Sequence, residues 1–270
     1  MKEFHLHLVS DATGETVISV ARAAVTQFED VHPIEHLWSL VRSRAQVEKI
    51  LAAIEANQGI VMFTLVDREL RELLQEGCRA LEVPCIPLLD PVMAALSAYL
   101  GAESRNQPGR QHVLDSEYFQ RIDAMTYVLS HDDGQSPDGL KDANVILVGV
   151  SRTSKTPTCF YLANRGLKAA NVPIVPGLPL PQELAAVTGP LIVGLMRNPE
   201  SLVEIRRNRL HVLNQDQETE YVDIEQVRAE VSAARRLFTE RSWPVIDITR
   251  RSIEETAAEV IQLYTQHLEA

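Results

Sequence analysis

Residues 149–156 have the residue types and spacing that most strongly suggest chemistry. Gly149 follows an apolar run, and a Ser-Lys-Thr triplet begins five residues after it. This spacing approximates the pattern G-x-x-x-x-G-K-[ST] of a phosphate-binding loop, in which backbone N–H groups and a helix dipole hold oxyanions. The sequence therefore predicts a nucleotide-binding segment, with Lys155 as a catalytic residue and Thr156 as a Mg²⁺ ligand. Its residues are Gly149, Val150, Ser151, Arg152, Thr153, Ser154, Lys155 and Thr156.

One position departs from this pattern. Ser154 stands where the pattern has its second glycine, so a Cβ lies where the backbone should come closest to phosphate. An ordinary strand-to-helix turn with a solvated lysine is the alternative interpretation. The context favours the phosphate site, because residues 145–148 are typical of a buried strand and an amphipathic segment follows Thr156.

A second candidate group consists of two adjacent carboxylates, Asp132 and Asp133, beside His131. Such a pair can hold Mg²⁺ or accept a proton from a hydroxyl group, and we assign both residues as candidate catalytic groups. The alternative is a solvated turn, because the Asp-Gly sequence that follows is a strong turn signal.

Basic residues are concentrated in one predicted helix of an otherwise acidic chain. Arg206, Arg207 and Arg209 lie in the segment that begins near Pro199. One guanidinium group can bind two phosphate oxygens at once, so Arg206 and Arg209 could stabilise a migrating phosphoryl group. A solvated helix face is the alternative.

Polar residues also follow the first predicted strand. Ser10 and Asp11 could cap the helix that begins a few residues later, and Gly14 permits close backbone approach. The other interpretation is a second polar pocket at the carboxyl end of a strand. His5 and His7 lie on one face of this strand, where packed or surface histidines are favoured over a metal pair because no third ligand is in view.

Strand and helix patterns alternate along the whole chain and predict an α/β protein with parallel sheets. We expect an N-terminal parallel-sheet α/β domain at residues 1–101 and a C-terminal P-loop-kinase-like α/β domain at residues 143–270. Between them we expect a linker and a connecting helix at residues 102–142, with an exposed loop at 101–110. The predicted strands cover residues 4–9, 34–40, 59–66, 85–89, 145–148, 190–196 and 244–248, with a further short strand from Val172.

Composition narrows the class of protein. A net charge of −11 over 270 residues argues against general nucleic-acid or anionic-membrane binding. The three cysteines, Cys78, Cys85 and Cys159, have no metal-ligand spacing and are expected to be reduced thiols. No signal sequence or apolar run of membrane-spanning length is apparent, so we expect a cytoplasmic protein.

Five motifs occur together in an order that resembles one known family, the pyruvate, phosphate dikinase regulatory proteins, which includes the phosphoenolpyruvate synthetase regulatory proteins. The resemblance covers essentially the whole chain. The motifs are residues 10–16, residues 118–125 with 131–135, residues 149–157, Gly194-Leu195 with the arginine helix, and residues 245–257.

The resemblance implies a bifunctional enzyme. Members of this family use ADP to phosphorylate an active-site threonine of the dikinase, which inactivates it and releases AMP. They reverse the modification with inorganic phosphate and release pyrophosphate. The family's nucleotide-binding segment carries over onto residues 149–156, Mg²⁺ is the expected cofactor, and a homodimer is suggested by analogy.

Three alternatives stay open from the sequence. The same chemistry could act on phosphoenolpyruvate synthetase. The chain could instead be an ATP-dependent small-molecule P-loop kinase, or a nucleotide-sensing module without activity.

Overall fold

The computed structural model describes residues 2–104, 116–212 and 220–269, and the chain divides into two compact units, Met1–Val113 and Leu114–Ala270. Each unit contains one four-stranded, fully parallel sheet covered by helices. The predicted fold class, two α/β domains with parallel sheets, is confirmed.

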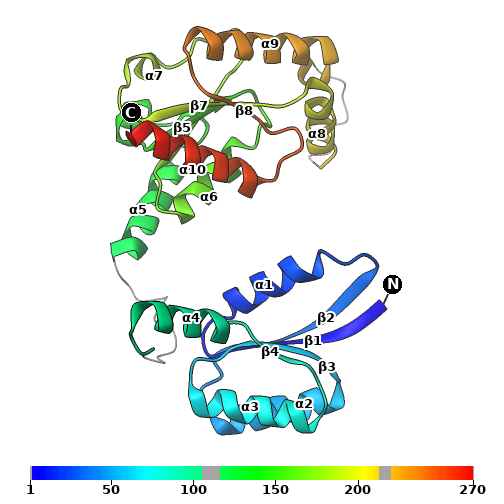
Figure 1. The fold of residues 1–270 in the computed structure, drawn as a ribbon. Coiled ribbons are helices and arrows are strands. Elements are labelled where there is room, and N and C mark those ends of the chain that lie inside the picture. The colour runs from blue at the N-terminus through cyan, green and yellow to red at the C-terminus, as the bar shows by residue number, and fades with distance from the viewer. Residues whose placement is uncertain (1, 105–115, 213–219, 270) are drawn as a thin grey trace. The chain divides into compact units, whose positions relative to one another are not determined.

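The sheet of the first unit has the strand order β2-β1-β3-β4. Helices α1 and α4 cover one face of this sheet and α2 and α3 cover the other (Figure 1). The strands are β1 (Lys2–Ser10), β2 (Val31–Trp38), β3 (Gly59–Thr64) and β4 (Cys85–Pro87). The helices are α1 (Glu15–Val25), α2 (Arg44–Ala56), α3 (Arg68–Ala80) and α4 (Asp90–Leu100).

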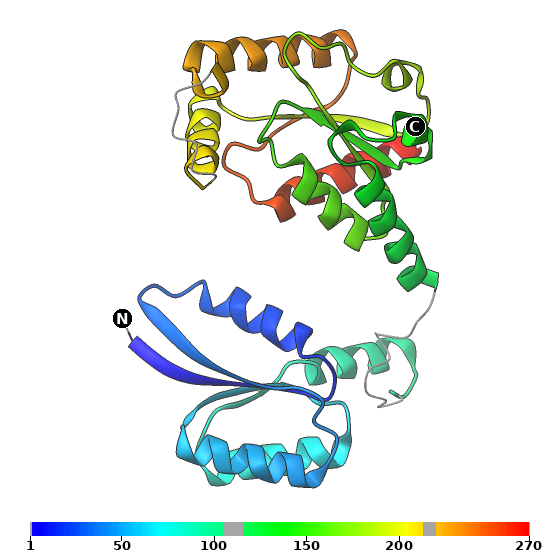
Figure 2. The ribbon, with the colours of Figure 1, turned by 180° about the vertical axis from the view of Figure 1, so that it is seen from behind.

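The sheet of the second unit has the equivalent order, β6-β5-β7-β8. Helices α5, α6 and α10 cover one face, while α7, α8 and α9 cover the other (Figures 1 and 2). The strands are β5 (Val145–Gly149), β6 (Ala169–Pro173), β7 (Leu191–Met196) and β8 (Val245–Asp247). The helices are α5 (Ser116–Ser130), α6 (Lys155–Asn164), α7 (Gln182–Ala186), α8 (Pro199–Val212), α9 (Ile224–Glu240) and α10 (Ile253–Glu269), with short 3-10 turns η2 (Asp132–Gly134), η3 (Pro137–Asp142) and η4 (Glu220–Val222).

Burial explains why the central strands are continuous apolar runs. Every residue of β5 is buried, because its two faces pack against different helix layers. Ile146 and Val148 contact the layer of α8 and α9, whereas Val145 and Leu147 contact the layer of α5, α6 and α10.

The shared strand order places one loop of each unit in the position where open α/β sheets bind ligands. In the second unit β5 has β6 on one side and β7 on the other, so the chain changes direction at the carboxyl end of β5. Residues 150–154 lie there. In the first unit the same position is taken by residues 11–14, after β1.

The structure differs from the sequence expectations at helix α5 and at strand β6. Helix α5 was expected to connect the domains, but Ala124 and Val128 are buried in the core of the second unit, so the helix belongs to that unit. Strand β6 begins at Ala169 rather than at Val172. The expected loop at 101–110 lies largely outside the described residues.

Two further expectations concern the state of the cysteines and the absence of membrane-spanning segments. Cys78, Cys85 and Cys159 are free, as predicted. Across the described ranges, every helix is too short or too polar to cross a membrane.

Candidate functional site

The loop that contains residues 149–156 joins the last residue of β5 to the first turn of α6. Gly149 ends the strand, and Lys155 begins the helix. Arg152 and Ser154 both adopt left-handed backbone conformations, with φ of 71° and 54°. Ser154 is the N-terminal cap of α6, and its conformation is one that glycine adopts most readily, which explains the glycine of the phosphate-loop pattern at this position.

Gly149 is required by close packing. A Cβ at this position would lie 2.7 Å from the carbonyl oxygen of Leu195 in β7 and 2.7 Å from Oγ1 of Thr153. Thr153 is fully buried, and its hydroxyl donates to the carbonyl oxygen of Val150 over 2.9 Å. The glycine therefore allows the loop to fold back tightly against the neighbouring strand.

The Lys155 side chain lies inside this loop. It is 5 % exposed, and its Nζ donates to the carbonyl oxygen of Val150 over 3.0 Å. Burial lowers the pKa of Lys155 to about 8, although the carboxylates of Asp133 and Asp132 act in the opposite direction. The protein therefore holds a desolvated cation where the sequence predicts contact with phosphate.

A cavity of about 450 Å³ opens over the loop, within the usual size range of a small-ligand site. The loop and one carboxylate line its polar side. The opposite side is apolar and comes from the segment after β6 and from α8. The lining residues are Asp133, Ser151, Arg152, Thr153, Ser154, Lys155, Thr156, Pro157, Pro173, Ile174, Val175 and Ile205.

The fold brings the two predicted carboxylates to this loop. Oγ1 of Thr156 donates to Oδ1 of Asp132 over 2.9 Å, and Asp133 lines the cavity. Asp133 has a left-handed φ of 50°, an unfavourable conformation for a residue other than glycine. Asp133 thus lines the pocket and Asp132 binds a residue of its loop, so the pair is not a turn remote from the site.

His131, in contrast, packs against Tyr127 of α5. Its ring is 8 % exposed and stacks on Tyr127 with centroids 3.8 Å apart. Its Nδ1 lies 2.9 Å from the carbonyl oxygen of Tyr127, which makes it the protonated nitrogen in that contact. The structure supports a packing role for this histidine.

The structure corrects the interpretation of Arg206. Its side chain is 1 % exposed and forms an ion pair with Glu230, with Nη2 and Oε2 2.7 Å apart. The guanidinium also donates to the carbonyl oxygens of Tyr221 and Ser151 over 3.0 and 3.3 Å and lies 4.5 Å from the centre of the Tyr221 ring. Arg206 is therefore buried and supports the loop through its hydrogen bond to Ser151, and it does not face a migrating phosphoryl group. Arg207 and Arg209 are exposed.

Tyr221 also supports the loop, and sequence analysis did not identify it. Its hydroxyl lies 3.1 Å from Oγ of Ser151 and accepts from Nε of Arg152 over 3.3 Å.

Asn171 is a second site residue that the sequence did not predict. It is 1 % exposed in β6 and donates to Asp132 over 2.6 Å. A lone amide in a buried strand was the available signal, because asparagine is depleted in strands.

The corresponding turn of the first unit has different chemistry. Helix α1 is capped by Gly14 without any side-chain hydrogen bond, so the prediction of a Ser10 or Asp11 cap was wrong. Both side chains are buried and bind other partners. Oδ2 of Asp11 accepts from the backbone of Val66 over 2.7 Å, and Oγ of Ser10 accepts from Thr64 over 3.0 Å. The side chains thereby tie β1 to β3.

The histidines of β1 are packed together with a third from β2. His5 Nδ1 and His36 Nε2 are 2.9 Å apart, and the His7 and His36 rings stack at 4.6 Å. Within the described ranges, no three or more His, Cys, Asp or Glu side chains are arranged to hold a metal ion. Burial lowers the pKa of His7, which favours its neutral form.

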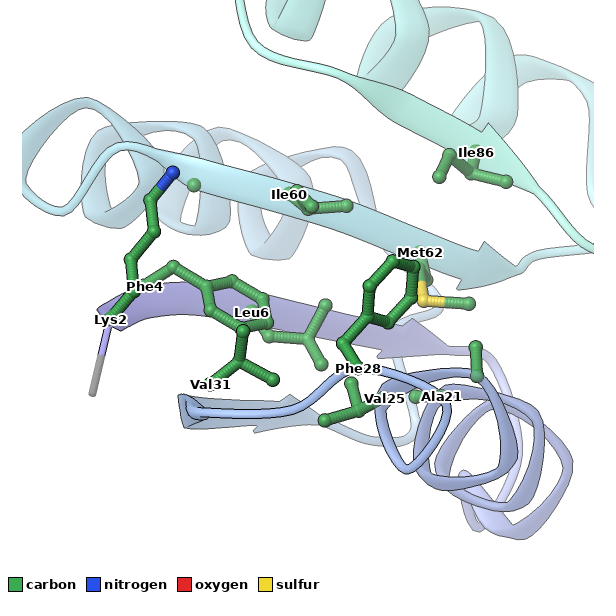
Figure 3. Close-up of a pocket in the computed structure, with 12 residues that line it drawn as sticks. Lys2, Phe4, Leu6, Ala21, Val25, Phe28, Val31, Ile60, Met62 and Ile86 are labelled. Atoms are coloured by element: carbon green, nitrogen blue, oxygen red, sulfur yellow. The ribbon is translucent and has the colours of Figure 1, made fainter.

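The first unit also contains an apolar cavity of about 460 Å³ between α1 and the sheet (Figure 3). Phe4, Leu6, Ile60 and Met62 form its floor, and Phe28 extends over it. Its only charged lining residue is Lys2. This cavity lacks the polar groups that a phosphorylated ligand requires.

Comparison with known proteins identifies relatives over the whole chain. A model of the family described as kinase/pyrophosphorylase matches residues 6–261. A pyruvate, phosphate dikinase regulatory protein of Paramagnetospirillum magneticum is 61% identical over 269 residues, which cover 100% of this chain and 86% of the relative. A protein of the same name from Caulobacter vibrioides is 57% identical over 96% of this chain and 82% of its own length. One from Rhodospirillum rubrum is 53% identical over 97% of this chain and 95% of its own length.

Proposed function

This chain belongs to the kinase/pyrophosphorylase family, and from this membership we propose that it reversibly phosphorylates a threonine of pyruvate, phosphate dikinase. In one direction it uses ADP as phosphoryl donor and inactivates the dikinase. In the other it uses inorganic phosphate to remove the phosphoryl group and releases pyrophosphate. The observation that carries the proposal is the hydrogen bond between Thr156 and Asp132. It brings the carboxylate of Asp132 to the loop that contains Lys155.

The forward step is a phosphoryl transfer between oxygens. The target threonine oxygen attacks the β-phosphorus of ADP, and the bond from that phosphorus to the oxygen bridging the two phosphates breaks. AMP leaves with the bridging oxygen. The hydroxyl proton passes to a carboxylate, for which Asp132 and Asp133 are the candidates.

The reverse step has the same form. An oxygen of inorganic phosphate attacks the phosphorus of phosphothreonine, the bond to the threonine oxygen breaks, and pyrophosphate leaves. The threonine oxygen takes up a proton, which the same carboxylates can return.

The cavity over the 149–156 loop is suited to the charged part of this chemistry. Phosphoryl transfer depends mainly on positioning and on neutralisation of charge. Lys155 would turn from the carbonyl oxygen of Val150 to the phosphate chain, assisted by N–H groups at the start of α6. The apolar side formed by Ile174, Val175 and Ile205 would contact the nucleoside.

The residues present also fit Mg²⁺, the expected cofactor. Thr156 and Asp133 offer oxygen donors on the cavity wall, and Asp132 lies next to them in a hydrogen bond with Thr156. Mg²⁺ prefers one or two carboxylates together with phosphate oxygens and water. When bound, the ion would supply charge neutralisation at the phosphate oxygens.

Incubation of the purified chain with pyruvate, phosphate dikinase and ADP labelled in its β-phosphate tests the proposal. The label should appear on one dikinase threonine, with AMP as the released product. Addition of unlabelled phosphate without ADP should then remove the label as pyrophosphate. Transfer to phosphoenolpyruvate synthetase alone would change the target, whereas transfer only from ATP, with ADP as product, would contradict the proposed chemistry.

A further inference from the structure

Asn171 is a buried polar residue in a strand that is otherwise apolar on both sides. Its side chain is 1 % exposed, and its neighbours Ala169, Ala170 and Val172 pack into the two cores of the unit. An amide at such a position is unfavourable for burial unless it forms hydrogen bonds. The partners of this amide are therefore informative.

The hydrogen-bond partners of the side chain among the described residues belong to the candidate site. Nδ2 of Asn171 lies 2.6 Å from Oδ1 of Asp132, 2.9 Å from Oγ1 of Thr156 and 3.2 Å from Oδ1 of Asp133. Thr156 in turn donates to the same oxygen of Asp132. One amide group thus joins both carboxylates to the first turn of α6.

The backbone of Asn171 contributes to the same arrangement. Its N–H donates to the carbonyl oxygen of His131 over 3.0 Å, which ties β6 to the residue immediately before η2. The side-chain carbonyl Oδ1, in contrast, is buried with no hydrogen-bond partner among the described residues. A rotated amide would direct this oxygen at the carboxylates and repel them, so the carboxylates determine the orientation of the amide.

We propose that Asn171 is a positioning residue for phosphoryl transfer, which holds Asp132 and Asp133 at the mouth of the loop through its amide N–H groups. The proposal rests on the function proposed above and adds a residue to its site. Because Asn171 contacts only the Oδ1 atom of each carboxylate, the amide leaves each Oδ2 atom for the target hydroxyl or a cation. Without the donor, the hydrogen bond from Thr156 to Asp132 would have to hold the pair against the repulsion of two like charges and the left-handed backbone of Asp133.

Asn171→Ala removes the donor and should separate turnover from binding. We expect kcat for transfer from ADP to fall at least 30-fold, while the dissociation constant for ADP, measured by calorimetry, changes less than threefold. The reason is that the amide does not line the nucleotide cavity, and apart from its contact with Oγ1 of Thr156 it acts on the carboxylates. Asn171→Asp, which keeps the size but replaces the donor with an acceptor, should lower kcat at least as far.

Asn144 provides the matched control. It lies at the opposite end of β5, where its amide donates to the hydroxyl of Tyr264 over 2.8 Å and its carbonyl accepts from the backbone of Lys168. Asn144→Ala should lower the melting temperature by a similar amount to Asn171→Ala and leave kcat unchanged. Equal kcat for the wild type and the folded Asn171→Ala variant would overturn the proposal.

A crystal structure of Asn171→Ala tests the positioning claim without any activity. The expected result is that the Asp132 carboxylate moves beyond hydrogen-bond distance of Thr156, while residues 149–156 keep their backbone path. A carboxylate that stays in place would overturn the claim. If the wild type transfers nothing from ADP, the proposed function fails, and this structure still decides the role of Asn171.

Discussion

Thr156 and Asp132 are 24 positions apart in the sequence, and a 2.9 Å hydrogen bond joins them. The threonine belongs to the start of α6 and the aspartate to the turn before β5, so the bond brings the two predicted motifs into one site. Asn171, from β6, contacts both. Residues of η2, α6 and β6 therefore converge at the carboxyl end of the sheet in the second unit, where ligands bind in open α/β folds.

Replacement of either carboxylate should test whether this convergence serves chemistry. Asp132→Asn and Asp133→Asn keep the size of the side chain but remove the charge, and Asp132→Asn retains an oxygen that can accept from Thr156. We expect both directions of transfer to slow by 100-fold or more, with melting temperatures within a few degrees of the wild type.

The exposed Asp138, in the neighbouring η3 turn, supplies the control. Asp138→Asn should retain full activity. Normal turnover by both the Asp132 and the Asp133 variants would show that the pair is only a turn.

Lys155 should destabilise the protein when no ligand is bound. Its folded pKa of about 8 lies below its ordinary 10.5, so the folded state disfavours the protonated amine. Lys155→Met removes this cost and should raise the free energy of unfolding at pH 7 by about 1–3 kcal/mol, while ADP affinity falls tenfold or more. Urea unfolding and calorimetry measure the two effects, with the exposed Lys141→Met as control.

The same pKa shift predicts how this difference depends on pH. Below pH 8 the lysine is protonated in both states, and the whole cost is present. Between pH 8 and 10.5 the unfolded chain binds more protons than the folded one, so wild-type stability rises with pH. The gain from Lys155→Met should therefore shrink over this range. A gain that is constant from pH 7 to pH 10 would contradict the assignment.

Ser154 offers a test of backbone conformation. Its left-handed φ of 54° is costly for a residue with a Cβ, and glycine removes that cost. Ser154→Gly should raise the free energy of unfolding by roughly 0.5–1 kcal/mol and leave ADP binding as tight or tighter. Ser232→Gly, in the right-handed and exposed part of α9, should have the opposite effect on stability.

The Arg206–Glu230 ion pair should stabilise the folded protein and, through Ser151, the conformation of the loop. Arg206→Met leaves Glu230 largely buried without its partner, a change that costs about 3–5 kcal/mol in comparable cases. ADP binding should weaken too, because the carbonyl oxygen of Ser151 loses a donor. The double variant with Glu230→Gln should recover part of the stability but not the ADP affinity. Full recovery of affinity would show that Arg206 acts on the fold alone.

Local patterns in the sequence were sufficient to predict the sheets. Apolar runs such as β5 and β3 exclude solvent on both faces, and that requirement is visible in consecutive residues. The contacts of the turn after β1 could not be predicted in this way. Ser10 and Asp11 are good capping residues by type, yet Gly14 is the N-terminal cap of α1. The side chain of Ser10 binds Thr64 in β3 and that of Asp11 binds Val66 just after β3, and both partners are distant in sequence.

The candidate site was predictable in its motifs but not in its contacts. The spacing around Lys155 is local, so the loop could be identified without a structure. Arg206 was misjudged because its burial depends on Glu230 and Tyr221, which approach it only in the folded unit. Asn171 has no motif around it, and its importance depends on the strand order that places β6 beside η2 and β5.

A final prediction is that both directions of transfer use one site. The second unit contains a cavity with Lys155 on its polar side, whereas the equivalent turn of the first unit contains the buried carboxylate of Asp11. One positive site can hold the β-phosphate of ADP in the forward direction and inorganic phosphate in the reverse direction. ADP should therefore compete with phosphate during pyrophosphate release, and Lys155→Ala should impair both reactions.

The paired assay includes variants of the first unit, because those variants separate one site from two. Asp11→Asn and Thr13→Ala should alter stability or docking of the dikinase, without abolishing one direction selectively. Asp11 in particular binds the backbone of Val66, so its loss should first appear in the melting temperature. Suppose instead that Lys155→Ala abolishes transfer from ADP but keeps pyrophosphate release, while Thr13→Ala does the reverse. Each unit would then have its own site, and a shared phosphate site would be wrong.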